Sequence, residues 1–432
     1  MSQHNGGELS AVDLARLGLP ALPLAFVALP LYVLWPHHFA SQFGVSLSLI
    51  GGLLLLARAL DALIDPSLGH WLDACYARSP ERVLRRCYAA ALLLALSFIV
   101  LFFPQWLLGR EVAQADLLLL AGAMLVVCYL SYSVLTIALQ AWGARMGGDS
   151  VARSRLVGWR EACGLGGVIV ASLVSGLAGM AEMVAVLVLM LVLAMLSWSS
   201  APRPVPSAVD PLQAWWPSLW QPWKNSRFLR LLRIFMVNGI ASAIPATLIV
   251  FFVQDRLQLG IDMQAQFLGT YFVAAAISMP LWLRLIARWG LTTAWAVGMV
   301  MTVAVFIWSL ALGAGDVWGY TAVCALSGLA LGADLIAPGA LLNGLLQTRG
   351  EPQQHAGAYM GWWQVATKLN LALAAGISLP LLEWLGYTPG AQDPAALSAL
   401  SWSYALVPCG LKLGALLLLI RASDALQHKE SA

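Results

Sequence analysis

Most of this chain consists of long apolar segments that are separated by short polar stretches. An α-helix needs about 20 apolar residues to cross a hydrocarbon core of about 30 Å, because it rises about 1.5 Å per residue. Strands of outer-membrane barrels alternate apolar and polar residues, whereas residues 53–56 and 416–419 are continuous runs of leucine. The pattern therefore predicts membrane-spanning helices at about residues 17–37, 46–72, 84–104, 114–143, 155–178, 181–199, 229–253, 263–286, 290–313, 317–346, 357–382 and 396–420.

The composition excludes an ordinary soluble enzyme. Hydrophobic residues make up 60% of the 432 residues, charged residues make up only 10%, and the mean hydropathy is +0.79. Soluble domains carry about 25% charged residues. The polar N-terminal segment has neither the basic start nor the cleavage site of a secretory signal peptide. We therefore predict an all-α polytopic membrane protein with twelve transmembrane helices, which inserts through its first helix.

The sequence offers few signs of enzymatic or cofactor chemistry. The six cysteines are scattered without metal-ligand spacing, so neither a disulfide framework nor a zinc site is expected. No Walker motif or GxSxG element occurs. The net charge of +3 reflects the topology of the loops and does not indicate nucleic-acid binding. We expect no enzymatic activity, no cofactor and no nucleic-acid partner.

The basic residues indicate the orientation of the predicted helices. Cytoplasmic loops of membrane proteins are enriched in Lys and Arg. Twelve spans place both termini on the same side, and the loops on that side collect most of the basic residues. They are Arg78, Arg82, Arg85, Arg86, Arg145, Arg153, Arg155, Arg203, Lys224, Arg227, Arg230 and Arg233. The opposite loops offer Arg110 and Arg256. The predicted location is therefore the inner membrane of a bacterial-type cell, with both termini in the cytoplasm.

A polar segment rich in proline and tryptophan divides the chain into two halves. Its tryptophans suit a segment that lies at the membrane interface. Six predicted helices precede it and six follow it, which matches the two pseudo-symmetric six-helix halves of the major facilitator superfamily fold. The predicted organisation is an N-terminal half at 1–200, a cytoplasmic central loop at 201–228 and a C-terminal half at 229–432.

Three charged residues interrupt the second apolar segment. Asp61 and Asp65 are spaced i, i+4 and share one helix face with Arg58. A charge at the bilayer centre costs about 2.5–3.5 kcal/mol on insertion scales, so such residues point inward to partners or water. Counted back from Asp73 at the cytoplasmic end, Asp65 lies about 12 Å deep and Asp61 about 18 Å deep. Pro66 removes one backbone donor just below the pair.

Lys368 in the eleventh predicted helix lies at a comparable depth, about 16 Å from the same surface. Two carboxylates one turn apart repel each other, which raises one pKa and allows the pair to bind a proton. Alternatively, their oxygen atoms hold a sodium ion. A third interpretation is a structural network in which Arg58, Asp61, Asp65 and Lys368 hold the two halves together. These interpretations are compatible, because a network that opens when a cation binds is itself a coupling device.

Three segments resemble one transporter family. Residues 58–69, with the sequence RALDALIDPSLG, resemble the second helix of the glycoside–pentoside–hexuronide:cation symporters, the melibiose-carrier group of the major facilitator superfamily. Residues 357–369, GAYMGWWQVATKL, resemble its eleventh helix, and residues 328–338 resemble its tenth. The resemblance implies that Asp61 and Asp65 are the cation-site carboxylates and that Lys368 communicates with them.

The chain departs from the sugar-transporting members of that family. Those relatives use acidic residues in the first and fourth helices to bind sugar hydroxyls. Here residues 17–39 contain no acid, and the membrane portion of the fourth helix offers hydroxyls such as that of Tyr132. The resemblance therefore supports family membership, whereas a sugar substrate does not follow from it.

Further charged and aromatic residues form a candidate substrate and coupling network. Its members are Arg58, Tyr132, Arg160, Glu161, Asp334, Trp362, Trp363, Lys368 and Asn370. For Arg160, a local ion pair is the alternative to anion binding; for Asp334, the alternative is a structural partner of Lys368 or Arg160. For the tryptophans, the alternative is packing. Lys412 has no evident partner in the sequence, so we expect it to extend toward the membrane surface.

A cytoplasmic gate is expected below the pair. Gly69, Asp73 and Arg78 resemble the inner-loop signature of the superfamily, whose expected role is a charge latch between helices. Gly164, Gly166 and Gly167 give the fifth helix a small-residue face that suits close helix packing.

The sequence therefore predicts a monomeric secondary transporter in which Na⁺ or H⁺ drives symport of a small organic solute by alternating access. Arg58, Arg160 and Lys368 favour an anionic or amphipathic solute. The alternatives are an uncoupled carrier, an exporter, or a flippase-like protein that handles lipids or amphiphiles.

Overall fold

The computed structural model of the chain describes residues 9–109, 113–177, 179–204, 217, 219–347 and 355–426. These residues form two compact units, Met1–Lys224 with Leu346–Val365, and Asn225–Leu345 with Ala366–Ala432. The predicted central loop at 201–228 lies partly outside the described residues. The helices of the first unit are α1 (Ala11–Gly18), α2 (Ala21–Leu29), η1 (Pro30–Leu34), α3 (Trp35–Phe43), α4 (Leu47–Tyr76), α5 (Pro80–Phe102), α6 (Gln105–Leu108), α7 (Gln114–Ala144), α8 (Ser150–Leu177), α9 (Met180–Ser199) and α11 (Gln221–Lys224).

The second unit is also helical. Its helices are α12 (Ser226–Phe251), η2 (Phe252–Arg256), α13 (Ile261–Trp289), α14 (Leu291–Phe306), η3 (Ile307–Ala311), α15 (Val317–Leu346), α18 (Pro394–Ser401), η4 (Trp402–Leu406) and α19 (Val407–Leu426). One further helix, α17 (Ala356–Trp384), begins in the first unit and ends in the second.

The predicted membrane-spanning helices are confirmed. Within the described residues, eleven helical segments are long and apolar enough to cross a membrane. The 30-residue helix α4, which carries Arg58, Asp61 and Asp65 close together, is the twelfth. Large apolar side chains on their outer faces, such as Leu63, Leu119 and Ile277, are 70–76% exposed. Such faces require an apolar solvent, and the protein is therefore an integral membrane protein.

The first span is a helix with a π-helical turn. Pro30 has no N–H to donate, and it stands at the start of this turn, η1, between α2 and α3. The turn includes Tyr32, which becomes part of the site described below. Gly44 then ends α3 in the left-handed conformation (φ 64°), which glycine adopts without steric cost.

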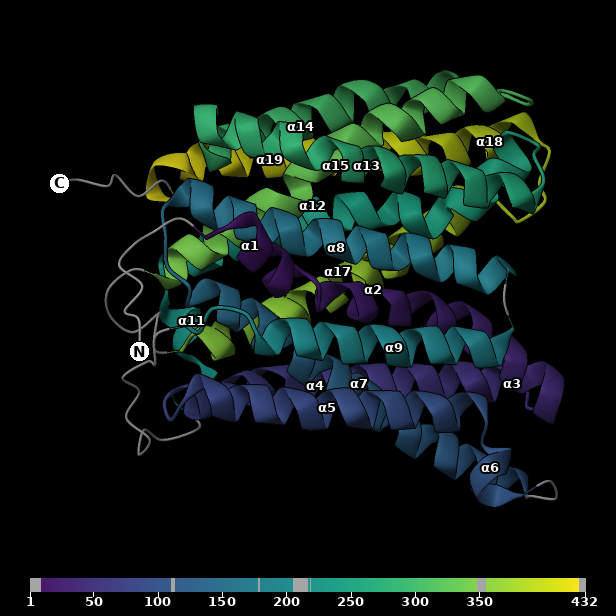
Figure 1. Cartoon of the computed structure of the whole chain (residues 1–432). Coiled ribbons are helices and arrows are strands. Elements are labelled where there is room, and N and C mark those ends of the chain that lie inside the picture. Colours follow the sequence, from purple (N-terminus) through teal and green to yellow (C-terminus); the bar gives the residue numbers. More distant parts are fainter. Residues whose placement is uncertain are drawn as a thin grey trace. The chain divides into compact units, whose positions relative to one another are not determined.

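Close backbone contacts bind the helices of the first unit together. α8 packs along α1 and α2, and α5 packs against α7 and α9 (Figure 1). A Cβ atom at Gly167 of α8 would overlap the backbone carbonyl of Leu22. This contact confirms the expected close packing of the fifth helix at Gly167, whereas nothing lies within 4 Å of a Cβ at Gly166.

The second unit packs α12 and α14 against α19 (Figure 1). Its core holds several aromatic rings; Phe252 stacks on Tyr404 with ring centroids 4.1 Å apart. Tyr404 also shares a 2.5 Å hydrogen bond with the hydroxyl of Tyr320. A Cβ atom at Gly328 of α15 would overlap the carbonyl of Tyr271, so α13 and α15 approach each other closely.

Candidate functional site

The predicted carboxylate pair of α4, Asp61 and Asp65, is deeply buried. Asp61 is 1% exposed and Asp65 is 0% exposed, and α4 continues through Pro66 as a helix. The hydroxyl of Ser133 on α7 donates a hydrogen bond of 2.6 Å to Oδ1 of Asp61. Ser133 is itself buried, so this bond joins α4 and α7 inside the first unit.

Arg58 lies beside two tyrosine rings of the same unit, Tyr32 and Tyr129, which stack on each other with centroids 6.2 Å apart. Its guanidinium donates to the hydroxyl of Tyr32 and lies 5.3 Å from the centroid of that ring and 5.7 Å from that of Tyr129. Asp61 and Tyr132 also interact electrostatically with the guanidinium. The structure therefore brings three residues of the candidate site, Arg58, Asp61 and Tyr132, into one neighbourhood.

Three residues of this cluster were not predicted: Tyr32, Tyr129 and Ser133. Tyr129 and Ser133 are spaced i, i+4 on α7, so they share a helix face, and this spacing was visible in the sequence. The direction of the Tyr32 side chain depends on the π-helical turn η1, which rotates its residues away from the faces that α-helical spacing predicts.

Asp73 caps the N-terminus of α17. Its carboxylate is 1% exposed and accepts backbone hydrogen bonds from Gly357 (2.7 Å) and Ala358 (3.0 Å). Arg145 of α7 pairs with the same carboxylate at 2.5 Å and lies 4.2 Å from the ring centroid of Tyr76. A helix N-terminus binds anions because its free N–H groups and its dipole both favour negative charge.

Arg78 was expected to form the gate with Asp73, but the cation at this carboxylate is Arg145. Arg78 is exposed at the end of the α4 segment. Arg145 takes this place because α7 packs directly against α4, whereas Arg78 lies beyond the last residue of α4, Tyr76.

Glycines hold α4 and α17 in backbone contact above this cap. A Cβ atom at Gly69 would overlap the carbonyl of Gly357, and a Cβ at Gly361 would lie 2.6 Å from the carbonyl oxygen of Asp65. Gly357 and Gly361 are spaced i, i+4 and therefore share one face of α17. The first part of α17 thus contacts the stretch of α4 that runs from Asp73 to Asp65.

Lys368 and Asn370 lie farther along α17, in its second-unit part. Both are buried, at 9% and 6% exposure. Lys368 follows Gly361 by seven residues, or about two turns, and lies on the same helix face. Asn370 packs on Gly239 of α12, where a Cβ atom would overlap its side-chain amide.

The two predicted tryptophans of α17 are located in the first unit. The indole of Trp362 donates a 2.9 Å hydrogen bond to the carbonyl of Leu219, and its ring lies 5.4 Å from Trp220 and 5.0 Å from Trp223. These are the contacts of a packing residue. Trp363 is buried at 7% exposure.

Arg160 and Glu161 pair with each other on α8. Nη2 of Arg160 lies 2.7 Å from Oε1 of Glu161, and Nε lies 3.1 Å from the same oxygen. Both side chains are mostly buried, at 15% and 28% exposure. The local ion pair that the sequence left open for Arg160 is thus present.

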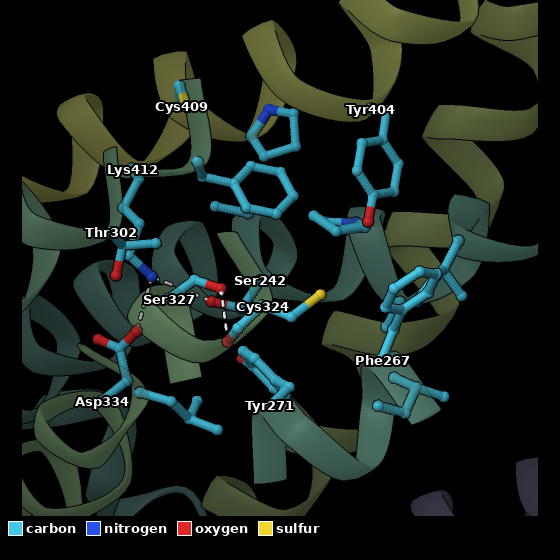
Figure 2. Close-up of a pocket in the computed structure, with 18 of the residues that line it drawn as sticks. Ser242, Phe267, Tyr271, Thr302, Cys324, Ser327, Asp334, Tyr404, Cys409 and Lys412 are labelled. Carbon is cyan, nitrogen blue, oxygen red and sulfur yellow. Dashed lines mark hydrogen bonds and ion pairs between the residues drawn. The ribbon is translucent and has the colours of Figure 1, made fainter. Parts of the chain in front are cut away.

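The second unit contains a buried ion pair between α15 and α19. Nζ of Lys412 lies 2.6 Å from Oδ2 of Asp334, with the side chains 4% and 8% exposed (Figure 2). Oδ1 of Asp334 accepts hydrogen bonds from Trp295 (2.8 Å) and Asn238 (3.1 Å). Ser242 accepts a second bond from Lys412, at 3.1 Å.

This pair corrects two expectations. Lys412 does not extend toward the membrane surface, and the cation paired with Asp334 is neither Lys368 nor Arg160. The assumption that the last helix faces lipid was the cause of the error. The available signal was that two opposite charges, each inside an apolar helix, tend to pair.

The acidic residues of the site define which cations it can hold. In the part of the chain that the structure describes, no three His, Cys, Asp or Glu side chains converge as a metal cluster. A hard monovalent cation at Asp61 and Asp65 would use carboxylate and hydroxyl oxygens, which are the donors present there, including Ser133.

The sequence is similar to one known protein family over nearly its whole length. The family described as MFS/sugar transport protein matches residues 16–423. A comparison with curated proteins finds no match.

Solved structures of several transporters share the fold. A bacterial homologue of the iron transporter ferroportin in an outward-facing state has a TM-score of 0.71 at 14% identity, covering 96% of this chain and 98% of that one. The E. coli fucose:proton symporter FucP has a TM-score of 0.66 at 15% identity, over 95% and 97% of the two chains. The human organic anion transporter MFSD10 has a TM-score of 0.62 at 18% identity, over 94% and 98%.

Proposed function

Because the chain belongs to the MFS/sugar transport protein family, we propose that it is a secondary transporter in which a cation drives symport of a small organic solute. The family and the fold are those of membrane transporters, which carry small solutes. The observation that carries the proposal of coupling is the pair of fully buried carboxylates Asp61 and Asp65, one helical turn apart on α4. Such intramembrane acids mark ion pathways.

The coupling ion, Na⁺ or H⁺, binds at Asp61 and Asp65 in this proposal. Two adjacent carboxylates repel each other while both are charged, so a bound cation relieves the repulsion. In this proposal the hydroxyl of Ser133 has one of two roles. Its oxygen binds the cation, or its hydrogen bond keeps the carboxylate of Asp61 oriented toward the cation. Lys368, on the face of α17 that carries Gly361, is the residue through which α17 responds to the change in charge.

The cap at Asp73 supplies the gate. Its carboxylate binds the N-terminus of α17 and Arg145 at the same time, so releasing α17 requires its two backbone hydrogen bonds to Asp73 to break. Alternating access requires one side of the transporter to close while the other opens. We assign Gly69, Asp73 and Arg145 to the cytoplasmic gate, and Arg78 only to its exposed surroundings.

For the solute, we propose an anionic or amphipathic organic molecule. Arg58 presents a guanidinium beside two stacked aromatic rings, an arrangement that suits a carboxylate attached to a ring or to an alkyl body. The acids with which sugar-transporting relatives bind their substrates are missing from the first and fourth helices. The similarity in fold to an organic anion transporter is compatible with this class.

The remaining properties are proposed from the sequence. Loops rich in Lys and Arg place both termini in the cytoplasm of a bacterial-type cell, with the protein in the inner membrane. We propose a monomer that needs no cofactor besides the coupling ion.

The test measures cation binding without knowledge of the solute. Purified protein is melted in detergent with NaCl or with choline chloride at equal ionic strength, and over a pH series. A cation that binds only the folded state stabilises it, by about 2.7 kcal/mol at 100 times its Kd. We expect Na⁺ or acid to raise the Tm of the wild type and to have no such effect on the Asp61→Asn/Asp65→Asn variant.

The matched control is Asp116→Asn, which changes an exposed aspartate at the start of α7. This variant should keep the full response of the wild type. A wild type that responds to neither cation would contradict coupling, as would an equal response in the double variant. Counterflow into proteoliposomes with a panel of aromatic carboxylates, alkyl carboxylates and sugars then identifies the solute class.

A further inference from the structure

A cavity of about 130 Å³ lies inside the second unit, beside the Asp334–Lys412 pair (Figure 2). Its wall comes from α12, α13, α14, α15, η4 and α19 and is mostly apolar. Aromatic side chains such as Phe267, Tyr271, Phe306 and Tyr404 form much of it. The charged pair therefore lies at one end of an aromatic cavity.

We propose that this cavity binds an uncharged molecule with one apolar ring and one hydrogen-bond acceptor, which Lys412 engages as donor. The size of the cavity sets the first condition. An engineered apolar cavity of about 150 Å³ in another protein stays dry and binds benzene. A cavity of this size and lining therefore accepts a single ring.

The charge of the pair sets the second condition. Asp334 and Lys412 neutralise each other, so an anion or a cation bound beside them would bring an uncompensated charge into an apolar interior. A neutral ligand carries no such cost. The site therefore selects against the anionic solutes proposed for the Arg58 region, and it does not depend on that proposal.

The hydrogen bonds of the pair show where the acceptor binds. An ammonium group has three donors. Within the described residues, Lys412 uses two of them, on Asp334 and Ser242. The carboxylate of Asp334 already accepts from Lys412, Trp295 and Asn238. The pair thus offers one more donor, and a carbonyl or ether oxygen satisfies it.

Stability alone does not account for the pair. A buried ion pair is often no more stabilising than apolar side chains of the same volume, and ionisable residues within transmembrane segments typically have functional roles. The cavity also has an access route, because two of its lining residues on α12, Ser242 and Ala246, are exposed.

The test uses three fluorinated probes and protein in lipid nanodiscs. 4-Fluoroacetophenone has the ring and the acceptor, 4-fluorotoluene has the ring only, and 4-fluorobenzoate carries a charge. Binding is measured by fluorine NMR, with empty nanodiscs as the blank for partition into lipid. We expect the ketone to bind at least about tenfold more tightly than 4-fluorotoluene, because its bond is to a charged donor, and the benzoate to bind more weakly than both.

Two variants separate the ring pocket from the donor. Ala246→Phe should fill the cavity and abolish binding of both 4-fluoroacetophenone and 4-fluorotoluene. Asp334→Asn/Lys412→Met removes both charges together, and it should bind the two probes equally. Lys224→Met, which changes an exposed lysine, is the control. Equal affinities in the wild type, or unchanged binding to Ala246→Phe, would overturn the proposal.

A measurement on the wild type covers the case in which a variant does not fold. Cys324 and Cys409 line the cavity and are free thiols, whereas Cys163 lies in the first unit. The ketone should slow alkylation of Cys324 and Cys409 by N-phenylmaleimide, as measured by peptide mass spectrometry, and leave Cys163 unchanged. If the ketone leaves the alkylation rates of Cys324 and Cys409 unchanged, the proposal is overturned.

Discussion

The candidate cation site of the first unit and the Asp334–Lys412 pair of the second unit bury charge in different ways. In the first unit, one arginine and two aspartates on α4 sum to one negative charge, and Arg58 and Asp61 contact tyrosine and serine hydroxyls of other helices. In the second unit, Asp334 and Lys412 balance each other, and neutral donors satisfy the remaining oxygen. The two adjacent carboxylates of the first cluster suit the exchangeable cation that we propose, whereas the balanced pair suits a neutral ligand.

The balance of the second pair can be broken by removing one partner. Lys412→Ala leaves the carboxylate of Asp334 buried without its cation, and breaking a buried pair in this way costs about 3–5 kcal/mol. We expect a large drop in Tm for this variant. Asp334→Asn/Lys412→Met should recover most of the loss, because it removes both charges. A double variant as unstable as the single one would show that the pair is not balanced as described.

The contact between α4 and α17 can be opened at one glycine. A Cβ at Gly361 would lie 2.6 Å from the carbonyl oxygen of Asp65, so Gly361→Ala forces the two helices apart. Overpacking of this kind costs about 1–3 kcal/mol. The control is Gly376→Ala on the same helix, where nothing lies within 4 Å of the added atom. Thermal melting of both variants measures the difference; similar Tm values would contradict the close contact.

The orientation of Asp61 can be loosened through Ser133. Ser133→Ala removes a hydrogen bond to a charged acceptor, which is worth about 1.5–3 kcal/mol. If Ser133 helps to hold the coupling cation, the concentration of Na⁺ or H⁺ that gives half-maximal stabilisation should rise by about tenfold or more. Ser131→Ala, at a buried serine two residues earlier on α7, should leave this concentration unchanged.

The smallest effect is expected at the rings around Arg58. Tyr129→Leu removes one aromatic face from the guanidinium, at a cost of about 0.5–2 kcal/mol. Tyr129→Phe keeps the ring and should retain most of the stability. Equal Tm losses in the two variants would mean that the hydroxyl of Tyr129, and not its ring, supports Arg58.

Hydropathy and spacing were enough to predict the fold. All twelve predicted spans correspond to helices, because the hydrocarbon core imposes both their length and their apolar composition. The match to the MFS/sugar transport protein family likewise agrees with the three segments that suggested it.

The partners of individual charges were harder to predict. The i, i+4 spacing correctly placed Asp61 and Asp65 on one buried face of α4. It does not tell which helix packs against that face, so Ser133 was missed, as was Arg145 at Asp73. Lys412 and Asp334 are 78 residues apart, and only the packing of α15 and α19 brings them together.

Helix α17 is a single rod whose two ends belong to different packing units. Trp384 lies 23 residues beyond Gly361, which is about 35 Å along the helix at 1.5 Å per residue. A tilt of about 10° at the glycine contact therefore moves the far end of the rod by about 6 Å, which is close to one helical turn. The absence of a side chain at Gly361 brings this end of the helix into contact with the backbone at Asp65. In the mechanism that we propose, cation binding at Asp65 therefore acts on one end of a long lever arm.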